Sequence, residues 1–129
     1  MSYYLSKMLN SSFGDAVIRA TDALKKEGFG ILTEIDVSAT LKKKINVDFP
    51  KYMILGACNP ALAYEALKLE NKVGTMLPCN VVVRDVGDGH VEVAAIDPVA
   101  SMQAIDNPAL KIAAAEVRAK LEKVIAGLR

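Results

Sequence analysis

The sequence has no tryptophan, two cysteines, one histidine and almost no excess of charge. Its 16 basic and 15 acidic side chains leave a net charge of +1, which excludes the large positively charged surface that binds nucleic-acid backbones. One histidine and two cysteines are too few for a four-ligand structural zinc site, although a partly open site that uses carboxylates remains an alternative. We therefore expect no nucleic-acid partner and no structural zinc.

Long hydrophobic runs are also missing. The longest uncharged stretch is the 13 residues 52–64, which contain a glycine and a proline, whereas a membrane-spanning helix needs about 20 apolar residues. The N-terminal residues show no secretory signal pattern. We expect a cytoplasmic protein without a membrane partner, in which both cysteines are reduced.

The chain has the size and composition of one globular domain. It has 129 residues, 52% hydrophobic and 24% charged, so we expect a single domain over residues 1–129. Apolar periodicity predicts strands at 3–9, 29–37, 51–57, 80–86 and 91–96, the last two joined by a Gly-Asp-Gly hairpin turn. The run of three apolar residues at 53–55 predicts that the third strand is central and covered on both faces.

Capping residues mark the helices. Ser12 followed by Asp15 begins a helix that Gly28 ends, and Ser38 is expected to cap a short helix through Asn46. An asparagine followed by proline starts the helices at 60–70 and from 108 to the C-terminus. The order predicts an α+β fold with a β-α-β(4)-α-type sheet, helices packed on one side and two short extra helices.

Cys58, Asn59 and Pro60 form the most distinctive local feature. A thiol just before a helix N-terminus faces unpaired amides and the positive end of the helix dipole, which stabilise a thiolate. The alternative is a small apolar side chain that closes a strand, because free cysteine is among the most buried residue types. Cys79 follows a proline and opens a strand, so that both thiols lie at strand ends that are close together if the strands are neighbours.

Glu34 and Asp36 project from the same face of the second predicted strand. Two carboxylates at this spacing are suited to acid–base work or to a hard cation. The alternative is an edge strand with a solvated acidic face.

These segments resemble a known family. Residues 34–37, 56–60, 77–81 and 97–98 are similar to the signature blocks of a family of small bacterial and archaeal proteins called domain of unknown function 302. The resemblance extends from Phe13 to Leu128. It implies a TATA-binding-protein-like arrangement of sheet and helices, assembly as a dimer, no nucleic-acid function and no established activity.

Three functions remain open. The first is a ligand- or metal-binding module with Glu34, Asp36, Cys58, Asn59, Pro60 and Cys79 around one cleft, where an anion or acyl carbonyl docks on the amides after Asn59. The second is a structural or interaction protein with core cysteines. The third is a thiol-dependent enzyme of persulfide or redox chemistry. The sequence identifies neither a cofactor nor a metal, and it leaves open whether the protein is an enzyme.

We also expect a homodimer. In the closing helix, Ile112, Ala113, Ala115, Ala119 and Ile125 widen the apolar surface beyond the stripe that one sheet needs to cover. An isologous interface is the commonest way to cover such a surplus. The helix and an exposed strand edge are the two candidate interfaces.

Overall fold

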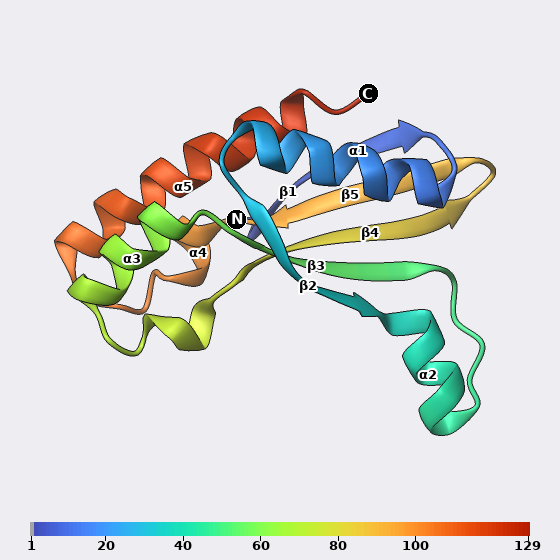
Figure 1. Ribbon diagram of the computed structural model, residues 1–129, viewed down its shortest axis with the longest axis horizontal. Helices are drawn as coiled ribbons and strands as arrows, with labels where there is room; N and C mark the ends of the chain where they lie inside the picture. The colour runs from blue at the N-terminus through green and yellow to red at the C-terminus, as the bar shows by residue number, and fades with distance from the viewer. Residues whose placement is uncertain (1) are drawn as a thin grey trace.

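A twisted antiparallel sheet forms the centre of the computed structural model, which describes residues 2–129 (Figure 1). Across the sheet the strands are β1 (Tyr4–Asn10), β5 (His90–Ile96), β4 (Cys79–Gly87), β3 (Tyr52–Cys58) and β2 (Gly30–Asp36). The helices are α1 (Phe13–Lys26), α2 (Val37–Ile45), α3 (Pro60–Leu69), α4 (Pro98–Ser101) and α5 (Pro108–Ala126), with a 3₁₀ turn η1 (Val73–Met76).

The long helices α1 and α5 pack on the same face of the sheet, and α3 and α4 flank the first half of α5 beyond the sheet's end (Figure 1). This arrangement confirms the predicted α+β fold with helices on one side. Within residues 2–129, no helix combines the length and the hydrophobicity needed to cross a bilayer.

The predicted caps are present at three helices. The side-chain oxygens of Ser12, Asn59 and Asn107 accept hydrogen bonds from the backbone N–H groups three residues further on, at 3.2, 3.3 and 3.2 Å. Each bond satisfies a first-turn N–H that has no partner within the helix. Gly28 follows α1 with a φ of 86°, as its predicted role requires.

Two local predictions were wrong. Asp36, rather than Ser38, caps α2, because its carboxylate accepts from the backbone N–H of Ala39 and from the Ser38 hydroxyl, both at 2.9 Å. The third strand is not covered on both faces: β3 is next to the edge strand β2, and Ile54 is half-buried on the face without helices. Apolar residues on an uncovered face produce the same sequence pattern as residues buried on both faces.

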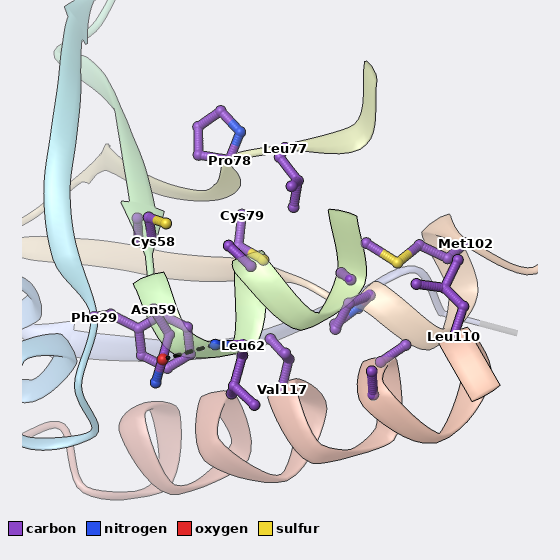
Figure 2. A pocket seen from close by; sticks show the side chains of 16 residues that line it. Phe29, Cys58, Asn59, Leu62, Leu77, Pro78, Cys79, Met102, Leu110 and Val117 are labelled. Atoms are coloured by element: carbon purple, nitrogen blue, oxygen red, sulfur yellow. Dashed lines mark hydrogen bonds between the residues drawn. The ribbon is translucent and has the colours of Figure 1, made fainter. Parts of the chain in front are cut away.

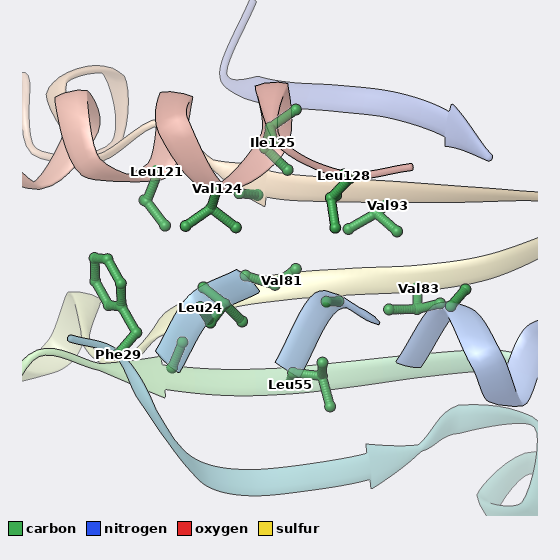
Figure 3. Packing of buried hydrophobic residues seen from close by; sticks show 14 of the residues in the cluster. Leu24, Phe29, Leu55, Val81, Val83, Val93, Leu121, Val124, Ile125 and Leu128 are labelled. Atoms are coloured by element: carbon green, nitrogen blue, oxygen red, sulfur yellow. The ribbon is translucent and has the colours of Figure 1, made fainter. Parts of the chain in front are cut away.

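The hydrophobic core consists of two clusters joined by α5. The main cluster lies between the sheet and the two long helices, and it includes Leu24, Leu55, Val81, Val93 and Leu121 (Figure 3). A second cluster lies beyond the end of the sheet and is built from Ala66, Val73, Met102, Leu110 and Ala114. The first half of α5 therefore packs in the second cluster, and its second half packs in the main one.

The orientation of α5 predicts that shortening a side chain lowers the free energy of unfolding by different amounts at different positions of this helix. Leu121→Ala, at a side chain that is fully buried, should lower the free energy of unfolding by about 2–5 kcal/mol because it leaves a cavity in the main cluster. Ile112→Ala, at a side chain 67% exposed on the same helix, should change it by less than about 0.5 kcal/mol. Urea denaturation of both variants measures the difference, and equal costs would show that α5 packs on another face.

Candidate functional site

A narrow apolar pocket lies where the ends of β3 and β4 meet α3, α4 and α5 (Figure 2). Its cavity volume is about 40 Å³. The wall combines residues of both hydrophobic clusters, such as Phe29 from the main one and Met102 and Leu110 from the second. No charged side chain lines it, and the polar groups on its wall are one amide, from Asn59, and two thiols.

The pairing of β3 with β4 brings the two thiols to this pocket. Cys58 is the last residue of β3 and Cys79 is the first of β4, and Ala57 lies directly opposite Cys79 in the antiparallel register. Both cysteines are free and both line the pocket (Figure 2). The strand ends that carry the two thiols are therefore neighbours, a relation that the sequence left open.

The environments of the two thiols differ. Cys58 is partly exposed, whereas Cys79 is only 7% exposed. Burial and, to a smaller extent, the charge of a Cys58 thiolate raise the pKa of the Cys79 thiol to about 11. Cys79 is therefore protonated at neutral pH.

Asn59 has a structural role at this site. Its side-chain oxygen caps α3, and its Nδ2 donates to the carbonyl of Glu27 at 3.4 Å, which ties the start of α3 to the end of α1. The N–H groups of Leu62 and Ala63 bond to Asn59 itself, through its side chain and its carbonyl. These amides are not free for the anion docking that the sequence suggested. Pro60 is exposed at the first helical position, outside the pocket wall.

The two predicted carboxylates do not line this pocket. Glu34 is exposed on the edge strand β2, opposite Leu55. Asp36 caps α2, and the hydrogen bonds from the Ala39 backbone N–H and from the Ser38 hydroxyl lower its pKa. Within residues 2–129, no three histidine, cysteine, aspartate or glutamate side chains converge as metal ligands would.

Sequence reasoning missed the walls supplied by Phe29, Met102 and Leu110, because distant segments contribute them. It also missed α4, although Asp97-Pro98 repeats the pattern of a capping residue followed by proline. Asp97 is 8% exposed, accepts from the backbone N–H of Val99 at 2.9 Å, and forms an ion pair with Arg118 of α5 at 2.9 Å. This contact holds α4 against α5, beside the pocket.

Comparison with known proteins places the chain in a family. Residues 5–128 match the model described as Domain of unknown function DUF302. The chain belongs to the DUF302 family. A crystal structure of an uncharacterized conserved DUF302 protein from Bacillus stearothermophilus superposes with a TM-score of 0.92 at 28% sequence identity, covering 100% of both chains. No curated protein matches the chain. The family assignment from the sequence blocks is confirmed, and with it the fold.

The buried thiol predicts a loss of stability in alkali. The pKa of Cys79 is about 11 in the folded protein against an ordinary value of 9.0, so between these values the unfolded chain releases a proton that the folded chain retains. Stability from this group is complete below pH 9.0 and is lost as the pH rises through 11, by about 3 kcal/mol in total.

Urea denaturation across this pH range tests the assignment. The difference in unfolding free energy between wild type and Cys79→Ala should shrink as the pH rises, because titrations common to both proteins cancel in the difference. Cys58→Ala serves as the matched control and should keep most of the wild-type pH dependence, because burial is the larger cause of the raised pKa of Cys79. A constant difference for Cys79→Ala would contradict the raised pKa.

Proposed function

We propose that this DUF302 protein binds a small ligand whose apolar end enters the pocket between the two hydrophobic clusters, next to the sulfurs of Cys58 and Cys79. The observation that carries this proposal is the composition of the wall, which combines two free thiols with apolar side chains and no charge. Apolar pockets with a few polar groups that converge on one point are typical ligand sites. The proposal retains Cys58 and Cys79 from the sequence-based site and omits the two carboxylates.

The pocket restricts the ligand in charge and size. A charged group inside it would lose its hydration without gaining a partner, so the inserted part is neutral. A cavity of about 40 Å³ holds a group of a few heavy atoms, since one water occupies roughly 10–15 Å³ by the same measure. Met102, which is flexible and lies in the wall, allows the pocket to adapt to slightly larger groups.

The alternatives have less support. A metal ion held by the two sulfurs requires thiolates, and burial keeps Cys79 protonated at neutral pH. No third ligand of the usual kinds converges on them among residues 2–129. A purely structural role for the cysteines explains the burial of Cys79 but not the partial exposure of Cys58 on the same pocket.

Filling the pocket should abolish binding of a small apolar probe. We expect n-butanol to shift the amide NMR signals of pocket residues such as Leu62 and Ala114 in a saturable manner. Ala113→Leu adds bulk at a half-buried position on the pocket wall and should remove this response.

Ala119→Leu is the matched control, because it makes the same change at an exposed position of the same helix. It should leave the titration unchanged. Equal responses of both variants, or shifts spread evenly over the protein, would reject the pocket as the binding site.

We further propose that a second copy of the chain covers the face of the sheet that carries no helices. In the register of the strands, a row of small and aliphatic residues crosses this face: Ser6, Ala94, Val82, Ile54 and Ile35. When one face of an antiparallel sheet is in water, the residues on that face are normally polar. This row favours contact with protein over contact with water, and it is a third candidate interface beside α5 and a strand edge.

The charges on this face are self-complementary. The row beside the aliphatic one contains Arg84 of β4 directly opposite Glu92 of β5, with Nε and Oε1 2.7 Å apart. A two-fold axis that runs parallel to the strands between β4 and β5 exchanges these two positions. Each Arg84 then faces Glu92 of the partner subunit, so the face is complementary in charge to a second copy of itself.

Substitution of isoleucine by glutamate at two positions distinguishes an interface on the open sheet face from one on α5. Ile54→Glu places a charge in the aliphatic row and should convert the dimer to a monomer of 13.8 kDa in sedimentation equilibrium. Ile112→Glu places the same charge on the exposed face of α5 and should leave the dimer intact. Dissociation by Ile112→Glu alone would assign the interface to α5, and a monomeric wild type would reject the dimer.

A further inference from the structure

A wide groove lies between the start of β1, α4 and α5, and Figure 1 shows α4 beside the first half of α5. Its volume is about 620 Å³, against about 40 Å³ for the pocket. Small-molecule sites typically measure roughly 300–1,000 Å³, so the groove has the size of such a site. Its apolar wall includes Val99, Met102, Ala114 and Ala115. Since Met102 and Ala114 also line the pocket, the two cavities are neighbours that share a wall.

Asp97 is the one acidic side chain on the groove wall within residues 2–129, and its carboxylate already has three partners. Its Oδ1 accepts hydrogen bonds from the backbone N–H groups of Val99 and Ala100, at 2.9 and 3.4 Å. Its Oδ2 accepts from Nε of Arg118 at 2.9 Å. Because Asp97 is also 8% exposed, a positively charged ligand would meet only a carboxylate that is buried and paired.

The two basic side chains of the groove, Arg118 and Lys111, still have unused hydrogen-bond donors. Arg118 bonds to Asp97 through Nε and to Glu122 through Nη1, but its Nη2 has no partner within residues 2–129. Lys111 is exposed and takes part in none of the ion pairs formed in this part of the chain. Since two carboxylates compensate the charge of Arg118, Lys111 supplies the one uncompensated positive charge of the groove.

We propose that this groove binds a small organic monocarboxylate, whose carboxylate contacts Lys111 and whose apolar body lies against Val99, Ala114 and Ala115. One uncompensated positive charge matches a monoanion, whereas a doubly charged phosphate would keep an unmatched charge beside Asp97 and Glu122. This binding goes beyond the proposed function, because the groove is a second cavity and needs no ligand in the pocket.

The two parts of the ligand contribute differently. Lys111 is exposed, so the carboxylate stays partly hydrated, and an ion pair of this kind raises the affinity about fivefold at most. The apolar body loses contact with water against the wall and supplies most of the affinity. The charge of the ligand therefore decides selectivity among molecules that have the same apolar body.

Three probes with the same hydrocarbon chain test this selectivity: hexanoate, n-hexanol and hexylammonium. In NMR titrations of the wild type, the amide signals of Ala100 and Ala115 report on the groove alone, and the signal of Leu62 reports on the pocket alone. At the groove signals, hexanoate should bind about fivefold more tightly than n-hexanol, and hexylammonium should bind more weakly than both.

Two substitutions on α5, each with a control on the same helix, separate charge from shape. Lys111→Gln should weaken hexanoate binding about fivefold and leave n-hexanol binding unchanged, whereas Lys123→Gln, at an exposed lysine outside the groove, should change neither. Ala115→Leu fills the groove and should weaken the binding of all three probes there. Ala119→Leu, at an exposed position outside the groove, should not.

Three results would overturn the proposal: no response of the groove signals to hexanoate, equal affinities of hexanoate and n-hexanol, or equal effects of Lys111→Gln and Lys123→Gln. If a variant fails to fold, the comparison of the three probes on the wild type still decides. The groove and the pocket are tested separately, because Ala113 lines only the pocket. Ala113→Leu should therefore lose the response to n-butanol and keep the response of Ala115 to hexanoate.

Discussion

The antiparallel pairing of β3 with β4 is the constraint on which the site depends. It places the C-terminal end of one strand beside the N-terminal end of the other, so residues 21 positions apart in sequence share a wall. The same pairing directs the chain out of the sheet into α3 at one strand end and receives it back from η1 at the other. A shift of one residue would move Cys79 to the opposite face of the sheet and would remove the buried thiol from the pocket.

An ion pair between the buried Asp97 and the partly exposed Arg118 supports the opposite wall. Asp97 caps α4, pairs with Arg118 of α5, and donates its backbone N–H to the carbonyl of Tyr3 at 2.8 Å. One residue thus joins the end of β5, a short helix, the long closing helix and the start of the chain. Because Asp97 is 8% exposed, loss of Arg118 would leave its buried charge without an opposite charge and would loosen α4.

Local chemistry could be predicted from the sequence more fully than non-local packing. Asn59-Pro60, Asn107-Pro108 and the hairpin glycines act within a few residues, and the structure confirms them. The edge position of β2 depends on which strands pair, and no local pattern encodes that choice. Strand pairing places Glu34 on an edge strand, where it faces solvent, and Cys79 on an inner strand, where it is buried. The residues that form the pocket walls could not be predicted from the sequence for the same reason.

The two edges of the sheet differ from its open face because an edge can pair with a strand of another chain through backbone hydrogen bonds. In β2 the pairing shifts between Ile31 and Thr33, a β-bulge that interrupts the row of backbone groups at one edge. At the other edge, Lys7 of β1 donates to the carbonyls of Ala126 and Leu128, at 3.2 and 2.6 Å, and holds the C-terminus beside the strand. The β2 edge is thus a poor template for an added strand, so the fold resists growth into fibrils by pairing through this edge.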